Sequence, residues 1–320
     1  MLKALITGIS GQDGAYLSRF LLNKNYQVFG LIRNQGTPLQ RLKYLDIEDK
    51  ITLIPCDLQN FNEIKWIIND EKPNEIYNLA AQSSVAESFK NPFETLNFNI
   101  NSVLNILESI KMIDKKIKFY QASSSEMFGR VDRLPVSEET PMHPLSPYAI
   151  SKATAHWITI NYRESFNLFT CCGILFNHES YLRGNDYFIK KVIREAIAIK
   201  NNKKNELIVG NIDIRRDFGY APSYIEAMWL MLQQNSPDDY IICSGRTYSL
   251  REIIYYIFDK IGIDKDKIVI DKSFFRPSEI IDMVGDPAKA RSKLQWNYSY
   301  DFLKILDLLI EEEKKNTIAP

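Results

Sequence analysis

The first fourteen residues constrain the fold more than any other part of the chain. A short apolar run, residues 2–7, is followed at once by glycines at positions 8, 11 and 14. In such a turn the first glycine permits the sharp bend, the second admits a pyrophosphate close to the backbone, and the third lets the helix pack on the strand. The N-terminus of the following helix favours phosphate. The turn therefore predicts a dinucleotide site, with contacts from Gly8, Ser10, Gly11, Gln12, Asp13 and Gly14.

The first half of the chain alternates short apolar runs with amphipathic stretches. The predicted strands are residues 2–7, 27–32, 51–56, 75–80, 118–122 and 169–175. The predicted helices lie near residues 13–24, 60–71, 93–113 and 147–166. Short runs that are apolar on both faces are typical of parallel strands covered by helices. This alternation predicts an α/β fold with a doubly wound parallel sheet.

The second half is less regular. Helices are expected near residues 185–201, 222–235, 249–262 and 301–315, and short strands near 206–210 and 240–243. This pattern indicates a smaller, mixed α/β lobe that covers a substrate. We therefore expect a cofactor-binding domain over residues 1–175 and a substrate lobe over residues 176–320, with some segments of the latter returning to the first domain.

Composition excludes several classes of protein. The 40 basic and 40 acidic residues give a net charge of zero, which argues against a protein that coats nucleic acid. The four cysteines have no spacing that indicates a metal site, and we expect them to be buried and reduced. With neither a signal-like start nor an apolar run of about 18 residues, the sequence predicts a cytoplasmic protein without a membrane segment.

The ends of the next strands indicate which dinucleotide is bound. NAD-specific sites usually carry an acidic residue after the second strand, where this chain has Arg33. An arginine can pair with a 2′-phosphate, so the sequence favours NADP. Asp57, after the third strand, can accept a hydrogen bond from the adenine amino group. We expect further cofactor contacts from Leu58, Leu79, Ala80, Ala81 and Gln82.

A candidate catalytic group follows the fifth strand. Tyr148 and Lys152 are four residues apart, so a helix places both on one face. A free phenol has a pKa of about 10, and a nearby ammonium would favour the phenolate that can act as a base. Ser124, at the strand end, can hydrogen-bond the hydroxyl that Tyr148 deprotonates. Glu126 supplies a carboxylate that hydride transfer does not require but that removal of a carbon-bound proton does.

These motifs together resemble the extended short-chain dehydrogenase/reductases, and among them the GDP-mannose 4,6-dehydratases. The resemblance covers nearly the whole chain and includes the Gln-Asp pair within the glycine turn and the Asn-His-Glu-Ser stretch at 177–180. The segments that carry it are residues 7–17, 77–83, 120–129, 156–164, 173–180, 216–219, 226–233 and 276–279. It implies a Rossmann-type fold and conversion of GDP-D-mannose to GDP-4-keto-6-deoxy-D-mannose, with NADP recycled.

The resemblance also implies roles for matching positions. Ser124 stands where the family usually has threonine, Glu126 matches its proton-abstracting carboxylate, and Tyr148 and Lys152 match its base and the partner of that base. Cofactor contacts are implied for His178 and Arg183. Contacts with a GDP-sugar are expected from Ser83, Ser124, Ser125, Asn177, Lys190, Arg216, Arg276 and Glu279. The family implies a homodimer or homotetramer.

Departures from the family pattern leave alternatives open. Leu145, Ile150 and Tyr181 differ from the usual residues at positions expected near the sugar. A 4,6-dehydratase acting on GDP-manno-heptose is therefore an alternative. So is a C4 reductase of a GDP-4-keto-6-deoxy sugar or an epimerase on the same scaffold, although Glu126 argues against an epimerase. A non-catalytic NADP-binding sensor is disfavoured by the intact set of Ser124, Glu126, Tyr148 and Lys152.

Overall fold

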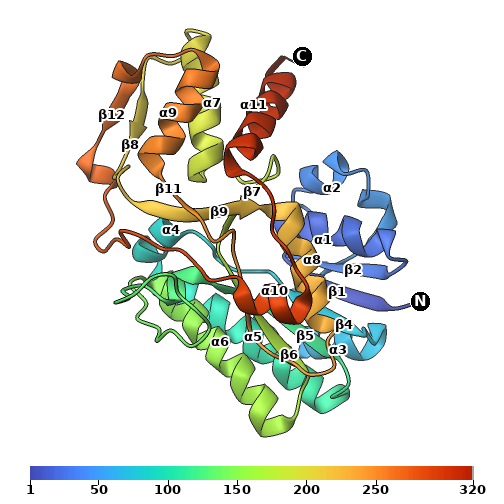
Figure 1. Ribbon diagram of the computed structural model, residues 1–320. Coiled ribbons are helices and arrows are strands. Elements are labelled where there is room, and N and C mark those ends of the chain that lie inside the picture. The colour runs from blue at the N-terminus through green and yellow to red at the C-terminus, as the bar shows by residue number, and fades with distance from the viewer. Residues whose placement is uncertain (319–320) are drawn as a thin grey trace.

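The computed structural model describes residues 1–318 and is built around a seven-stranded parallel sheet (Figure 1). Its strands lie in the order β10-β6-β5-β4-β1-β2-β3. They are β1 (Lys3–Thr7), β2 (Gln27–Ile32), β3 (Thr52–Pro55), β4 (Glu75–Asn78), β5 (Lys118–Ser124), β6 (Thr170–Leu175) and β10 (Tyr240–Ile242). The order reverses beside β1, so the chain winds outward in both directions from the glycine turn. The predicted α/β class and doubly wound parallel sheet are confirmed.

Helices cover both faces of this sheet. One face carries α3 (Phe61–Glu71), α5 (Pro92–Ile113) and α6 (Pro147–Phe166). The other carries α1 (Gln12–Asn23), α2 (Gln40–Tyr44), α8 (Ala221–Leu232) and α10 (Ala288–Leu294). The short helix α4 (Val85–Lys90) follows β4 at the carboxyl edge. Because α8 and β10 come late in the sequence, the second half of the chain contributes to the large sheet and to its cover.

A second lobe lies beyond the carboxyl edge of the large sheet (Figure 1). It contains α7 (Phe188–Lys200), α9 (Leu250–Ile261) and α11 (Phe302–Ile318), packed against the pair β8 (Leu207–Val209) and β12 (Ile268–Ile270). A three-stranded sheet joins the lobes, in the order β11-β9-β7. Its strands are β7 (Asn177–Glu179), β9 (Arg215–Tyr220) and β11 (Thr247–Ser249).

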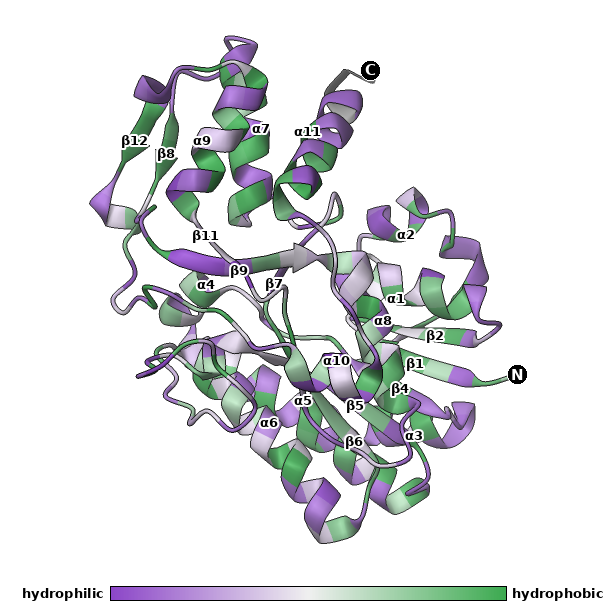
Figure 2. Ribbon diagram, in the orientation of Figure 1, coloured by the Kyte–Doolittle hydropathy of each residue, from purple (hydrophilic) through white to green (hydrophobic). Residues whose placement is uncertain are grey.

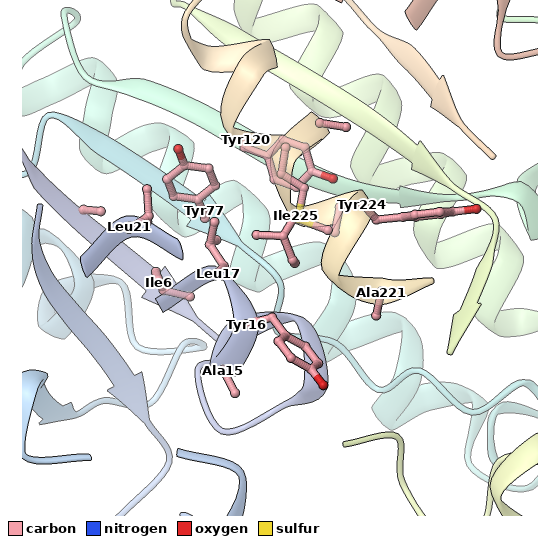
Figure 3. Close-up of a cluster of buried hydrophobic side chains, with 14 of the residues drawn as sticks. Ile6, Ala15, Tyr16, Leu17, Leu21, Tyr77, Tyr120, Ala221, Tyr224 and Ile225 are labelled. Carbon is pink, nitrogen blue, oxygen red and sulfur yellow. The ribbon is translucent and has the colours of Figure 1, made fainter. Parts of the chain in front are cut away.

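The hydrophobic core is divided by the large sheet. Hydropathy along the ribbon shows apolar residues concentrated on β1, β4, β5 and β6 and on the helix faces turned toward them (Figure 2). Between the sheet and the pair α1 and α8, fully buried Leu17, Tyr77, Tyr120 and Tyr224 pack together (Figure 3). Burial of apolar surface on this scale is the main stabilising contribution to a domain of this size. This packing holds α1 in place, and with it the glycine turn that precedes α1.

Sequence periodicity located the main helices and the strands of the large sheet to within a few residues, but it missed the joining sheet. The strand β9 has the sequence RRDFGY, whose charged residues hide the strand pattern. Its Arg216 and Asp217 are nevertheless buried, because each is hydrogen-bonded by neighbouring segments. The strands β7 and β11 are only three residues long. Strands that are held by polar contacts with distant segments show little of the apolar pattern by which a strand is recognised in the sequence.

Candidate active site

The glycine turn forms a cradle whose shape depends on missing side chains. Gly8 has φ +69°, and a Cβ there would lie 2.8 Å from the Ala80 nitrogen. A Cβ on Gly14 would lie 2.4 Å from the Gly8 carbonyl oxygen. The Gly11 amide donates to that same oxygen at 2.9 Å, which closes the turn. The remaining N-terminal amides of α1 face outward as an anion-binding end, so the residues present fit a dinucleotide pyrophosphate.

Gln12 and Asp13 connect the turn to the joining sheet. The Asp13 carboxylate lies 2.9 Å from His178 Nε2, and the His178 Nδ1 lies 2.7 Å from the Phe176 carbonyl oxygen. Gln12 accepts from the Ser180 hydroxyl and donates to the His178 carbonyl oxygen. Burial alone would raise the pKa of Asp13, but the His178 charge and the hydrogen bonds from His178 and Gln12 outweigh it and lower that pKa to about 2. Both ring nitrogens of His178 are thus engaged within the chain.

Replacement of Asp13 by asparagine should therefore destabilise the fold. A carboxylate whose pKa falls from 3.8 in the unfolded chain to about 2 contributes stability above pH 3.8 that is lost as the pH falls toward 2. We expect Asp13→Asn to lower the free energy of unfolding by about 2 kcal/mol at pH 6. Urea unfolding of both proteins at a series of pH values measures this difference in the free energy of unfolding. A difference between wild type and variant that does not shrink below pH 3.8 would contradict this ion pair.

The strand ends beside the turn are fixed by two buried polar residues. Thr7 Oγ1 donates to Asn78 and accepts from the amides of Leu79 and Ala80 at 3.1 Å. The side chain of Asn99, on α5, bonds the backbone of Gln82 twice and the Ser151 hydroxyl once. This holds residues 79–82 against the turn, where they were predicted to meet a cofactor.

The remaining predicted cofactor residues lie along the same edge of the sheet. Arg33 is exposed directly after β2. Asp57 and buried Leu58 follow β3, where the Asp57 carboxylate accepts from the Gln59 amide. Arg183, from the loop after β7, lies 3.6 Å from the buried Glu179 carboxylate. All these positions ring the carboxyl edge near β1, which is where open α/β sheets bind ligands.

The predicted catalytic residues of β5 and α6 come together in the structure. Tyr148 and Lys152 lie in the first two turns of α6, which is capped by Ser146, and both are buried. Lys152 Nζ donates to the Ala122 carbonyl oxygen at 2.7 Å, so α6 is pinned to β5 beside Ser124. Burial lowers the pKa of Lys152 to about 8, against an opposing effect of Asp13. Its ammonium is therefore present at neutral pH and lost as the pH rises through 8.

The phenol of Tyr148 is buried, and burial raises its pKa. A hydrogen bond with Ser124 and the charge of Arg183 act in the opposite direction, while the charge of Glu126 adds to the rise. The expectation of a phenolate base therefore relies on the positive charge of a nicotinamide ring in addition to the charges of the chain. The hydrogen bond brings the Ser124 hydroxyl and the Tyr148 phenol together.

Glu126 faces charged residues of the second lobe. It lies in the single helical turn after β5, and its amide donates to the Ser124 hydroxyl. Burial lowers the pKa of Arg216, and the Glu126 carboxylate is the largest charge acting against that shift. Arg216 also lies 3.3 Å from Glu279, which in turn lies 3.5 Å from Arg276. Two arginines and two carboxylates thus gather beside the end of β5.

The other predicted substrate residues do not all lie at the same site. Ser125 is buried next to Glu126, and Asn177 donates weakly to the Asp217 carbonyl oxygen at 3.4 Å. Ser83 lies on the turn before α4, where its hydroxyl meets Tyr187. Lys190 is occupied elsewhere, because its ammonium binds Glu313 at 2.6 Å and the Tyr181 carbonyl oxygen at 3.0 Å. The structure therefore does not bring Lys190 to the group around Glu126.

Three residues of this site escaped sequence reasoning. Asn99 is a buried amide on α5 whose helical neighbours Thr95 and Ser102 are also polar and buried, so no mismatch in the local pattern marks it. Arg41 donates to the Ser10 carbonyl oxygen at 3.0 Å and to the Leu182 carbonyl oxygen at 2.6 Å, which links the glycine turn to the loop after β7. Tyr187 precedes α7 and has no local pattern that marks it.

Within residues 1–318, no helix combines the length and the apolar character needed to cross a membrane. The same part of the chain has no cluster of three or more histidine, cysteine, aspartate or glutamate side chains that could hold a metal ion.

Comparison with known proteins identifies relatives over almost the entire chain. The sequence profile of the family described as GDP-mannose 4,6 dehydratase matches residues 5–309. GDP-mannose 4,6 dehydratase 1 of Arabidopsis thaliana is 43% identical over 322 residues, which cover 97% of this chain and 89% of the relative.

Solved structures show the same fold at lower identity. The dTDP-glucose 4,6-dehydratase of Bacillus anthracis, in complex with NAD, has a TM-score of 0.86 at 20% identity and covers 99% of this chain and 97% of its own. RMD from Pseudomonas aeruginosa, complexed with NADPH, has a TM-score of 0.80 at 24% identity. The match covers 99% of this chain and 100% of RMD.

Proposed function

The chain belongs to the GDP-mannose 4,6-dehydratase family and is an enzyme of the hydro-lyase class, and we propose that it converts GDP-D-mannose to GDP-4-keto-6-deoxy-D-mannose with NADP as its resident cofactor. The observation that carries this proposal is the position of Glu126. Its backbone amide bonds the Ser124 hydroxyl, and its carboxylate acts electrostatically on both Tyr148 and Arg216. A dehydratase needs such a carboxylate at the sugar in addition to the groups for alcohol oxidation.

Each of these residues has a separate task. A bound nicotinamide would supply the acceptor for the C4 hydride, its later donor to C6, and a positive charge that favours the Tyr148 phenolate. Ser124 and Tyr148 hold the C4 hydroxyl, and the Tyr148 phenolate takes its proton. Lys152 fixes α6 against β5 through the Ala122 carbonyl oxygen, and the Arg183 charge also favours the phenolate. The C4 ketone then acidifies the C5 hydrogen, which Glu126 removes as general base.

Loss of water completes the elimination. The C5–H electron pair forms the C5–C6 double bond as the C6–O bond breaks, and the departing hydroxyl takes the proton from Glu126 to leave as water. Glu126 thus serves first as base and then as acid, because the neighbouring position is Ser125 rather than a second carboxylate. Once C6 has been reduced, C5 takes a proton from solvent water, Tyr148 releases to solvent the proton that it took from the C4 hydroxyl, and the C4 ketone remains. No net reductant is consumed.

A nicotinamide cofactor is supported by the fold neighbours with bound NAD or NADPH and by the glycine cradle. The choice of NADP rests on Arg33, which lies exposed after β2 where an acidic residue would bind the NAD ribose. Its guanidinium can form charge-assisted hydrogen bonds with a 2′-phosphate. Gly8, Gly11 and Gly14 would hold the pyrophosphate, and residues 79–82 would line the nicotinamide half.

Replacement of Arg33 by aspartate should shift the preference from NADP toward NAD. The change removes a cation from the 2′-phosphate and introduces a carboxylate that can accept from a ribose hydroxyl. Because a charge-assisted hydrogen bond contributes about 1.5–3 kcal/mol, we expect NADP affinity to fall about 10–100-fold. Calorimetric titration with both dinucleotides measures it. Arg33→Lys serves as the matched control, and an unchanged NADP affinity in Arg33→Asp would contradict this role.

We assign the nucleotide half of the substrate to the second lobe. A GDP-sugar substrate follows from the family, and Arg216 and Arg276 can clamp its diphosphate with bidentate bonds. Glu279 can accept from a ribose hydroxyl or the guanine edge. This assignment keeps residues 1–175 as the cofactor domain and residues 176–320 as the substrate lobe, with α8 and β10 returning to the large sheet.

We also propose self-association through α5 and α6. A shallow apolar groove of about 700 Å³ lies on these helices, lined by Leu104, Ala153, Ile158 and others. Beside it Trp157 is 58% exposed and Ile150 is 45% exposed. Apolar patches of this kind mark protein interfaces. We propose that the protein forms a homodimer or homotetramer, and analytical ultracentrifugation measures its oligomeric state.

A cytoplasmic location is supported by four buried free cysteines.

The decisive assay follows both product and cofactor. Purified enzyme incubated with GDP-mannose and catalytic NADP should give a product lighter by one water, without net oxidation of NADPH. Loss of one water from GDP-manno-heptose in a parallel incubation, without loss from GDP-mannose, would identify a heptose dehydratase. In a separate incubation supplied with a GDP-4-keto-6-deoxy sugar and NADPH, consumption of one NADPH for each sugar reduced would instead identify a C4 reductase and overturn the proposal.

A further inference from the structure

Tyr187 connects the two lobes across the candidate active site. Its hydroxyl lies 2.6 Å from the Ser83 hydroxyl, although the two residues are 104 positions apart in the sequence. Ser83 lies on the turn between β4 and α4, and Tyr187 is the residue immediately before α7. In Figure 1, α4 lies on the side of the large sheet that faces the second lobe. The contact therefore joins the cofactor half of the site to the substrate half.

The Tyr187 ring is held in place by its own loop. The Arg183 guanidinium lies 3.9 Å from the ring centroid, in a cation–π contact. A Cβ on Gly184 would lie 3.1 Å from the ring, so the glycine allows the ring to pack closely on this loop. Tyr187 and Arg183 both act electrostatically on the Tyr148 phenol, which places them beside the reacting group. The ring is thus oriented independently of its hydroxyl.

The hydrogen bond between the Tyr187 and Ser83 hydroxyls can readily be replaced by hydrogen bonds to a ligand. It joins two neutral hydroxyls, and Ser83 is exposed to solvent. A neutral hydrogen bond contributes only about 0.5–1.5 kcal/mol net, and less in contact with water. Each hydroxyl can donate and accept. A sugar hydroxyl that enters between them can therefore replace the bond with two of its own, at little cost.

We propose that Tyr187 is a sugar-recognition residue, whose hydroxyl leaves Ser83 and hydrogen-bonds the hexosyl group when the nucleotide sugar binds. The inference rests on the proposed function for the identity of the sugar. It assigns specificity to a residue outside the group of Ser124, Glu126, Tyr148 and Lys152. The ring, fixed by Arg183, sets the position of the hydroxyl, and Ser83 holds it in the absence of substrate.

The variant Tyr187→Phe removes the hydroxyl and keeps the ring on Arg183. We expect the KM for GDP-mannose to rise about 3–10-fold, as loss of one neutral hydrogen bond predicts. The kcat should change less than about twofold, because the hydroxyl does not touch the reacting atoms. The inhibition constant of GDP, which lacks the sugar, and the affinity for NADP should stay unchanged. Tyr300→Phe is the matched control, since it removes a tyrosine hydroxyl and keeps the ring, which packs on Tyr298.

The outcomes separate recognition from a merely structural role. An equal loss of affinity for GDP and GDP-mannose would show that the variant disturbs the lobe, and would overturn the proposal. A lower KM would show that the Ser83 bond only blocks entry, and would also overturn it. Failure of the wild-type enzyme to turn over GDP-mannose refutes the proposed function instead. The calorimetric comparison of GDP with GDP-mannose on both proteins still tests Tyr187 in that case.

Discussion

Replacing Tyr148 by phenylalanine should abolish every chemical step, including the first reduction of bound cofactor. Oxidation at C4 requires a group that takes the hydroxyl proton as the hydride leaves, and the Tyr148 phenol is hydrogen-bonded to Ser124 for that purpose. Positioned proton transfer contributes typically 10²–10⁴-fold, so we expect kcat to fall by about that factor. Substrate binding should change little, because the phenylalanine ring fills nearly the same buried volume.

Single-turnover absorbance of the nicotinamide measures this prediction directly. The Tyr148→Phe variant loaded with oxidised cofactor should show no reduced nicotinamide after GDP-mannose is added. Tyr162→Phe is a matched control on the same helix, since Tyr162 lies about four turns along α6 from Tyr148 and its hydroxyl bonds Glu108 of α5. Rapid cofactor reduction in Tyr148→Phe would show that another group takes the C4 proton.

The part of this site that sequence can predict is the part encoded locally. The glycines at 8, 11 and 14 have a fixed spacing and stand between a strand and a helix, and the structure shows the tight cradle that spacing requires. The pair Tyr148 and Lys152 is likewise a local, helical relation. The main strands were found because each contains a short apolar run. Family resemblance agreed with the role that the residues indicated for Glu126 and added that of Arg276, which spacing alone does not specify.

The contacts that sequence reasoning missed are formed between distant segments. Asp13 and His178 were both expected at the cofactor, but their mutual bond spans 165 positions and no local pattern encodes it. Arg41 reaches the Leu182 carbonyl oxygen only because the loop after β7 folds back over α2. Lys190 was expected to contact the GDP-sugar, yet its ammonium binds Glu313 on α11. Such pairings depend on how whole elements pack, and periodicity carries no information on that.

The residue that most sharply divides dehydratase from reductase chemistry is Glu126, and its amide variant should stall the reaction halfway. Glu126→Gln keeps the size of the side chain and its place beside Ser124 and Arg216. It removes the base that takes the C5 proton and the acid that protonates the leaving hydroxyl. We expect overall turnover to fall about 10²–10⁴-fold, while oxidation at C4 continues.

The stalled enzyme should hold one equivalent of reduced nicotinamide and one of a 4-keto hexose that still carries its C6 hydroxyl. Solvent deuterium should not enter at C5, because exchange there needs the same base. Mass spectrometry of the bound sugar and absorbance of the cofactor measure the two halves separately. Glu279→Gln is the matched control, since Glu279 lies in the same charged group but is placed at the nucleotide. Near-normal turnover of Glu126→Gln would remove Glu126 from the elimination and would favour the reductase, because a reductase needs no base at C5.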